Sequence, residues 1–221
     1  MSSGTVDRAA IARHTALDLL EIGAVFLRPD EPFTWASGIR SPIYCDCRLT
    51  LSAPEVRGHI EASLAEIVRD SWTDCDAIMG TSTAGIPHAA IIGHLMGLPM
   101  GYVRGGDKDH GRQNRIEGRL EPGWRVAVIE DLISTGGSAI EVCEVLKEAG
   151  AEVLGIAAIF TYGMVRGIDN LSAANITCHT LTNFDVLVEV AAENGYIAES
   201  DIARLRKFRD NPNDESWITA K

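Results

Sequence analysis

The chain has 221 residues, of which 46% are hydrophobic and 23% charged, a balance typical of a globular protein with one domain. Its net charge of −11 argues against a broad surface for nucleic acid or anionic membranes, which attract basic proteins. The longest apolar run, Val153–Phe160, is too short to span a membrane, and the N-terminus lacks the apolar core of a signal peptide. We therefore expect a cytoplasmic protein that binds neither nucleic acid nor membrane.

The first third of the chain predicts a helix, then short strands, then a second helix. Asp7–Glu21 has helical apolar spacing. Phe26–Arg48 is rich in proline, glycine, serine and aromatic residues, which favours short strands and turns. Ser52 is expected to cap a helix that has Pro54 near its first turn. The apolar stripe of that helix comprises Val56, Ile60, Leu64 and Ile67.

Strands and helices alternate from Asp76 onward. The expected strands are Ala77–Met79, Met100–Val103, Arg125–Ile129, Val153–Thr161 and Ile176–Leu181. The expected helices are Gly85–Leu95, Ser138–Ala149, Phe184–Glu193 and Glu199–Lys207. This alternation predicts an α/β fold with a parallel sheet flanked by helices. Because ligands bind at the carboxyl ends of such strands, the loops at 80–85, 104–118 and 130–138 should meet at one edge.

A carboxylate pair and a glycine loop stand at the end of the third expected strand. Glu130 and Asp131 precede Ser134–Ser138, and a helix then begins. Glycine lets backbone amides approach a ligand closely, and a helix N-terminus offers free N–H groups and partial positive charge. These groups suit a phosphate, whereas the carboxylates suit the hydroxyl groups of an attached ribose. The segment therefore predicts a site for a ribose 5-phosphate.

Val126–Ser138 (VAVIEDLISTGGS) resembles the phosphoribosyl pyrophosphate (PRPP) motif of the type I phosphoribosyltransferases. The resemblance implies a parallel α/β core with a small N-terminal hood over the base and a flexible catalytic loop. It also implies that Glu130 and Asp131 contact the ribose hydroxyls, with Asp131 as a catalytic residue. The other PRPP-binding residues implied in this motif are Leu132, Ile133, Ser134, Thr135, Gly136, Gly137 and Ser138.

Two upstream loops have the composition of anion-binding segments. Gly80–Pro87 combines small residues, hydroxyl groups and the start of a helix, and the resemblance makes it the pyrophosphate loop. Its implied PRPP-binding residues are Thr83, Ala84 and Gly85. The polar stretch Gly105–Pro122 is long for a connection in a compact domain, which favours a lid that closes over a leaving pyrophosphate. The cations singled out for this role are Arg104, directly before the stretch, and Lys108 and His110 within it, and the last two are implied to be catalytic.

With the N-terminal PFTWASGIRSPIYCDCRLTLS, these loops resemble the orotate phosphoribosyltransferase family over roughly residues 16–165. The resemblance implies transfer of the 5-phosphoribosyl group from PRPP to orotate, giving orotidine 5′-monophosphate and pyrophosphate in pyrimidine nucleotide synthesis. It implies Mg²⁺ bound mainly through PRPP, and a homodimer in which the lid of one subunit serves its neighbour's site. The implied orotate-binding residues are Ser134, Ser37, Gly38, Tyr44 and Tyr162.

Four positions depart from the family pattern. Lysine often stands where this chain has Ala36, Ala84 and Gly105, and an arginine is often found near Tyr162. These departures concern the binding of the base more than that of PRPP. Two other hypotheses stay open: a transferase for another base, such as a purine, and a PRPP-sensing regulator without catalysis. The intact lid favours retained chemistry.

The expected organisation is one phosphoribosyltransferase domain over residues 1–221. An N-terminal helix and the base-binding hood occupy 1–50, and the PRPP-binding core occupies 70–185. The segment 209–221 is polar and is expected to be a disordered tail.

Cysteine and histidine residues point to no further chemistry. The five cysteines include no Cys-x-x-Cys pair, so reduced thiols are expected rather than a zinc site. His14 and His59 are interpreted as surface groups on helices, and His88 and His94 as packing or surface groups. No metal site made by the protein alone is expected.

Overall fold

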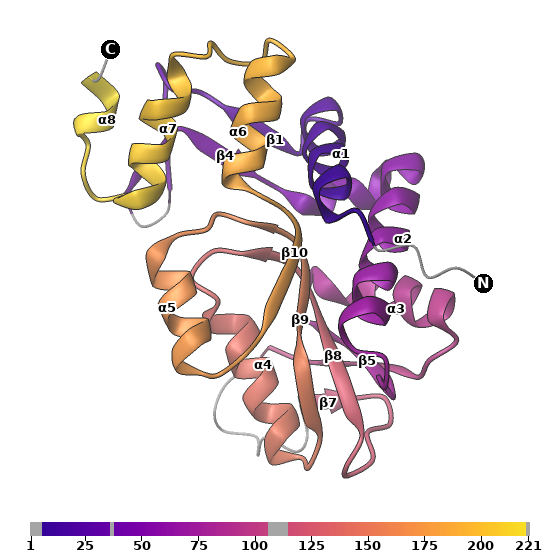
Figure 1. The fold of residues 1–221 in the computed structure, drawn as a ribbon. Coiled ribbons are helices and arrows are strands. Elements are labelled where there is room, and N and C mark those ends of the chain that lie inside the picture. Colours follow the sequence, from indigo (N-terminus) through magenta and orange to yellow (C-terminus); the bar gives the residue numbers. More distant parts are fainter. Residues whose placement is uncertain (1–5, 36–37, 106–114, 220–221) are drawn as a thin grey trace.

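Apolar runs form the central strands of a six-stranded sheet, in the order β10-β9-β8-β5-β6-β7 (Figure 1). The computed structural model describes residues 6–35, 38–105 and 115–219. The strands are β5 (Ala77–Thr81), β6 (Met100–Val103), β7 (Ile116–Glu117), β8 (Arg125–Ile133), β9 (Glu152–Thr161) and β10 (Cys178–Asn183). Neighbours are parallel except β7, which pairs antiparallel with β6. The predicted α/β fold with a parallel sheet is confirmed.

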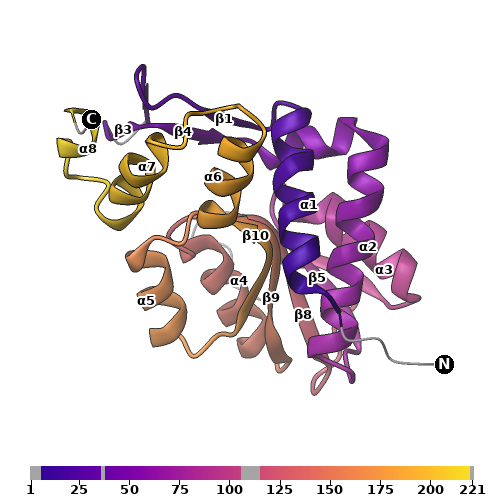
Figure 2. The ribbon, with the colours of Figure 1, turned by 45° about the horizontal axis from the view of Figure 1, so that its top comes forward.

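Helices cover both faces of this sheet (Figures 1 and 2). One face carries α1 (Arg8–Glu21), α2 (Pro54–Ser71) and α3 (Gly85–Met96), and the other carries α4 (Gly137–Glu148) and α5 (Val165–Ala173). Because successive side chains of a strand point to opposite faces, Ile78 packs into the first core and Met79 into the second. The predicted apolar stripe of α2 is buried in the first core.

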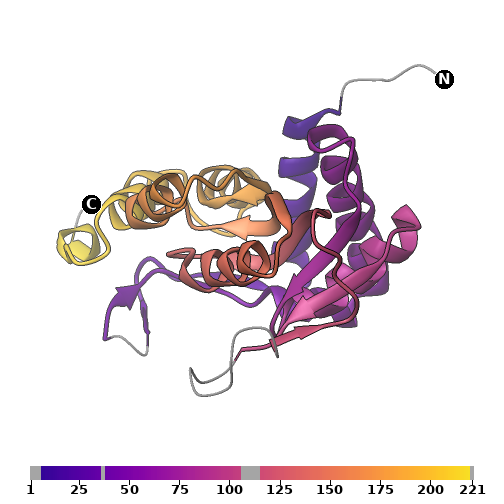
Figure 3. The ribbon, with the colours of Figure 1, turned by 90° about the horizontal axis from the view of Figure 1, so that it is seen from below.

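Short strands form the hood predicted for the N-terminal region. β1 (Val25–Leu27) pairs with β4 (Ile43–Cys45), and β2 (Phe33–Thr34) pairs with β3 (Arg40–Ser41), both antiparallel. A short 3-10 helix, η1 (Cys47–Ser52), follows. Figure 3 shows the hood reaching out from the sheet on the side away from α2 and α3.

The C-terminal tail packs against the fold, so the prediction of disorder is wrong for its described part. After α6 (Phe184–Glu193) and α7 (Asp201–Asp210), a short helix α8 (Ser216–Thr219) closes the chain. Trp217 on α8 is fully buried, and its ring lies 5.6 Å from that of Phe208. The polar composition of this tail did not indicate its structure, because a single aromatic side chain, that of Trp217, anchors it.

Three smaller predictions need correction. Ser52 does not cap α2, because it ends η1, and Ala53 stands at the N-cap without a side-chain hydrogen bond. The polar stretch before Pro122 contains β7. Local sequence patterns did not predict this strand, because it forms by pairing with β6. Helix α5 was not predicted; it is short, and Gly167 is the one buried residue that it contributes. None of the described helices is both long enough and apolar enough to cross a membrane.

Candidate active site

The carboxylate pair lies on a strand, which corrects the predicted strand end at Ile129. β8 continues through Glu130 and Asp131 to Ile133, because its pairing with β9 extends beyond its pairing with β5. The backbone N–H of Asp131 donates to Glu130 Oε1 at 2.9 Å. Glu130 is only 6% exposed, whereas Asp131 is half-buried. Asp131 is therefore the carboxylate more open to a ligand.

Burial gives Glu130 an unusual affinity for its proton. Desolvation, followed by a hydrogen bond with the Asp131 side chain, raises the pKa of Glu130 to about 8, although a hydrogen bond with Thr81 acts in the opposite direction. A carboxyl group that keeps its proton can donate as well as accept a hydrogen bond. The pair then carries less negative charge, which eases the approach of a phosphorylated ligand.

We expect the Glu130→Gln variant to lose part of the pH dependence of stability. The pKa of Glu130 rises on folding from about 4.5 to about 8, so the folded chain holds more protons than the unfolded chain between these values. The free energy of unfolding of the wild type should therefore fall as pH rises through this window, and glutamine should remove that contribution. Thermal unfolding at about pH 5 and about pH 9 measures it. If the free energy of unfolding depended on pH equally in the two proteins, the raised pKa of Glu130 would be contradicted.

The N-terminus of α4 forms an open anion cradle. Gly136 stands at its N-cap with a φ of +74°, a conformation that favours glycine, and no side chain caps the helix. Helix α5 supports the loop: Asn170 Nδ2 donates to the Thr135 carbonyl at 2.8 Å. A Cβ at Gly167 would lie 2.4 Å from the Ser134 carbonyl oxygen, so only glycine allows this approach. The first amides of α4 are thus held in place and available to a phosphate.

The loop after β5 packs tightly against the end of β8. A Cβ at Gly85 would lie 2.4 Å from the carbonyl oxygen of Ile129. The Ser82 hydroxyl donates to the Val103 carbonyl, which ties the loop to the end of β6. These contacts place a second helix N-terminus, that of α3, beside the carboxylate pair.

The strand-end pocket is a cavity of about 410 Å³ where these segments meet the hood. Its lining residues are Cys45, Asp46, Cys47, Arg48, Ser82, Thr83, Ala84, Glu130, Asp131, Leu132 and Ser138. Six of them, from Thr83 to Ser138, were predicted PRPP-binding residues. The predicted convergence of the 80–85 and 130–138 loops therefore holds.

Arg48 brings a cation to this pocket that the sequence did not single out. Its guanidinium forms a two-point interaction with Asp46, from Nε to Oδ1 at 2.6 Å and from NH2 to Oδ2 at 2.7 Å. That hydrogen bonding lowers the pKa of Asp46. The sequence feature that could have indicated Arg48 is its position directly after the hood strands, where a basic side chain could contact an anionic ligand.

The Trp35 pocket, a second cavity of about 630 Å³, lies on the other side of the glycine loop. Its lining residues are Trp35, Ile39, Ser134, Thr135, Met164, Val165, Arg166, Asp169, Asn170, Asp210, Pro212 and Asn213. Trp35 and Ile39 come from the hood, and Ser134 is a predicted orotate-binding residue. Arg166 is the one cation among these residues, all of which the structure describes. It went unnoticed because α5 was not predicted.

Three predicted orotate-binding residues line neither of these two pockets. Tyr162 is buried, with its ring 5.2 Å from Phe160 and 5.6 Å from Trp35. Burial raises the pKa of its hydroxyl well above the usual range. Tyr44 is exposed on β4, and Gly38 occupies a turn with a φ of +85°. These positions place Tyr162 behind the pocket wall and leave Tyr44 at the surface of the hood.

Of the three predicted lid cations, Arg104 is the one within the described residues. It follows β6, and its Nε lies 3.3 Å from Glu117 Oε1 on β7. The remaining predicted site residues, Ser37, Lys108 and His110, lie outside the described residues.

A parallel sheet with an acidic strand end, facing two uncapped helix N-termini, suits a ligand that joins phosphates to a sugar. The sequence matches the phosphoribosyl transferase domain family over residues 51–185, more than half of the chain. Fold and site thus define a phosphoribosyltransferase.

Proteins with similar sequences identify the family within this class. The orotate phosphoribosyltransferase of Bacillus mycoides (strain KBAB4) is 54% identical over 208 residues, which are 94% of this chain and 99% of the relative. That of Listeria innocua is 55% identical over the same shares. The crystal structure of orotate phosphoribosyltransferase from Aeropyrum pernix superposes with a TM-score of 0.71 at 29% identity, covering 83% of this chain and 99% of that one. The chain belongs to the orotate phosphoribosyltransferase family.

Proposed function

We propose that this protein transfers the 5-phosphoribosyl group of PRPP to orotate, giving orotidine 5′-monophosphate and pyrophosphate in pyrimidine nucleotide synthesis. The observation that carries the proposal is the strand-end pocket, where the carboxylate pair meets the open N-termini of α3 and α4. The bond from a ring nitrogen of orotate to the anomeric carbon forms, and the bond from that carbon to the pyrophosphate oxygen breaks.

Different segments of the chain contact different parts of the substrates in this proposal. The amides at Ser134–Ser138 bind the 5-phosphate, and Thr83–Gly85 bind the pyrophosphate. Asp131 accepts hydrogen bonds from the ribose hydroxyls and favours the positive charge that builds on the sugar. Arg104, together with Lys108 and His110 of the lid, offsets the negative charge on the departing pyrophosphate.

Mg²⁺ fits the proposed site as a companion of PRPP. Asp46 and Asp131 offer oxygen atoms at the strand-end pocket, and oxygen is the donor that Mg²⁺ prefers. The ion is proposed to bind mainly through the phosphates of PRPP. When bound, the ion would neutralise phosphate charge.

We propose Arg166 as the group that binds the carboxylate of orotate. Lysine and arginine positions common in the family are Ala36 and Tyr162 here, so the anionic base needs another cation. Arg166 is exposed and lies in the Trp35 pocket with Ser134. Of the two aspartates there, Asp210 is ion-paired with Arg209 at 2.6 Å, which limits its competition for Arg166.

The Arg166→Gln variant tests this role. Loss of a charge-assisted hydrogen bond to a carboxylate should raise KM for orotate about 10- to 100-fold with a smaller change in kcat. Slow turnover of uracil, which lacks the carboxylate, should change little. Arg119→Gln is the matched control, because Arg119 is largely exposed and lies outside both pockets. An equal effect on orotate and uracil would show that Arg166 has only a structural role.

The homodimer proposal predicts recovery of activity in mixed subunits. Lys108→Ala and Asp131→Asn should each be nearly inactive. If the lid acts in the neighbouring site, exchange creates one intact site per hybrid dimer and about a quarter of wild-type activity. Mixing Asp131→Asn with the Lys108→Ala/Asp131→Asn double variant provides the control, since no intact site can form. No recovery despite verified subunit exchange would argue against a shared site.

A spectrophotometric assay with PRPP, Mg²⁺ and orotate tests the whole proposal. Orotate should be consumed, and adenine and hypoxanthine should not. Turnover of a purine would support the alternative transferase. Binding of PRPP without consumption of any base would support the regulatory alternative.

A further inference from the structure

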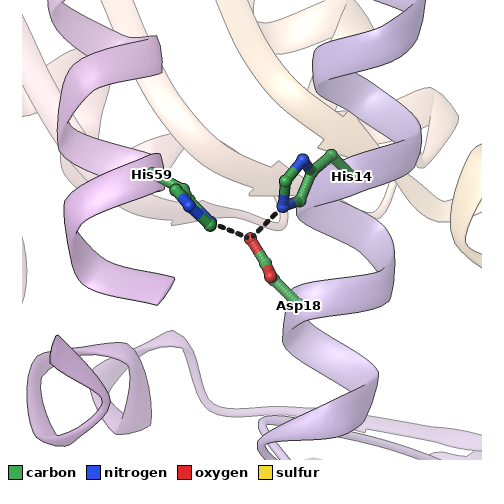
Figure 4. A group of neighbouring side chains, drawn as sticks. All are labelled: His14, Asp18 and His59. Carbon is green, nitrogen blue, oxygen red and sulfur yellow. Dashed lines mark ion pairs between the residues drawn. The ribbon is translucent and has the colours of Figure 1, made fainter. Parts of the chain in front are cut away.

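Three side chains of types that can bind a metal ion lie together between α1 and α2. His14 and Asp18 are one turn apart on α1, and His59 faces them from α2 (Figure 4). One donor atom of each residue lies within 4.8 Å of the others. The two imidazole rings meet edge to face with centroids 4.7 Å apart. None of these residues lines the strand-end pocket or the Trp35 pocket.

The spacing of these side chains fits an ion better than direct hydrogen bonds. His14 Nε2 and His59 Nδ1 both lie 3.5 Å from Asp18 Oδ2, beyond the usual range for a hydrogen bond between nitrogen and oxygen. Two ligands at about 2.1 Å from a tetrahedral ion are separated by about 3.4 Å. The observed separations therefore leave the space that a coordinated ion would occupy.

Burial of Asp18 supplies an independent sign of a missing ligand. The Asp18 side chain is only 9% exposed, and its Oδ2 has no hydrogen-bond partner among the described residues. A buried carboxylate oxygen without a partner is unfavourable. Figure 4 shows both imidazole rings turned toward this oxygen. A cation at this position would satisfy it.

Access and donor type define the kind of ion. The histidine side chains are 58% and 57% exposed, and a cavity of about 280 Å³ opens beside them, so solvent can supply a fourth ligand. Two imidazole nitrogens and one carboxylate oxygen suit Zn²⁺ and neighbouring transition metals. Mg²⁺ prefers a shell of oxygen atoms.

We propose that His14, Asp18 and His59 bind a divalent transition metal ion such as Zn²⁺, which links α1 to α2. This site is separate from the Mg²⁺ that accompanies PRPP. The ion would bind the folded chain and join two helices that are distant in sequence. It should therefore stabilise the fold. The expectation that His14 and His59 are plain surface groups is revised accordingly.

Thermal unfolding and calorimetry of the chelator-treated full chain test the site. Zn²⁺ at about 100 times its Kd should raise the wild-type melting temperature by roughly 5–10 °C, and Mg²⁺ should not reproduce this shift. Co²⁺ should give the strong visible absorption of a tetrahedral centre. His14→Gln and His59→Gln should each weaken binding at least about tenfold, and because both side chains are largely exposed, these variants should fold.

His94→Gln is the matched control, since His94 is an exposed histidine on α3 outside the group. It should bind Zn²⁺ as the wild type does. Absence of Zn²⁺ and Co²⁺ binding in the wild type would overturn the proposal. So would binding that the His14 and His59 variants retain unchanged, because the ion would then lie elsewhere.

Discussion

Replacing Asp131 with asparagine is expected to lower kcat by about 10²- to 10³-fold, a loss comparable to removing one charge-stabilising group from an active site. Asp131 is the more exposed member of the carboxylate pair and lines the strand-end pocket. Asparagine keeps the shape of the side chain but removes the negative charge that would stabilise the positive charge on the ribose. The loss should therefore appear mainly in kcat rather than in KM for PRPP.

Steady-state kinetics with varied PRPP measure this effect. Asp74→Asn makes the same chemical change at a largely exposed side chain outside the pocket and should leave kcat within a factor of about two. Thermal unfolding should show that Asp131→Asn is folded. Full activity of a folded Asp131→Asn enzyme would remove Asp131 from the proposed mechanism.

Replacing Glu61 with alanine should destabilise the fold by about 3–5 kcal/mol, because it breaks a buried contact between two polar side chains and leaves His88 without its partner. Glu61 on α2 and His88 on α3 are both almost fully buried, and Glu61 Oε1 lies 2.5 Å from His88 Nδ1. The pair joins two helices that cover the same face of the sheet. A loss of this size corresponds to roughly 6–20 °C in melting temperature for a chain of this length.

Chemical denaturation of matched variants tests the role of this pair. Glu66→Ala alters an exposed glutamate on the same helix and should change the free energy of unfolding by less than about 1 kcal/mol. The Glu61→Leu/His88→Leu double variant should recover much of the stability, since it removes both buried polar groups. Equal effects of Glu61→Ala and Glu66→Ala would show that the pair contributes little.

Local patterns were sufficient for much of the fold and part of the site. The strands at Ala77 and Met100 and the helix Phe184–Glu193 follow from apolar periodicity, which depends on neighbouring residues alone. The convergence of the 80–85 and 130–138 loops follows from a general property of parallel sheets. The site's chemistry was readable because the acidic pair and the glycine loop are adjacent in the chain.

Tertiary structure decided what depends on distant partners. β8 runs on to Ile133 because β9 pairs with it, and the polar tail is ordered because Trp217 reaches a buried position. Arg48 and Arg166 enter the two pockets from η1 and from α5, segments whose path local propensity does not set.

By itself, the sequence determined the class of fold and the phosphate chemistry of this protein, since both rest on short contiguous motifs. Only the three-dimensional packing brought Glu61 to His88, and His14 and Asp18 to His59. Glu61 and His88, for example, are 27 positions apart in the chain. Their formation depends on how helices pack on the sheet, which is a collective property of the whole core.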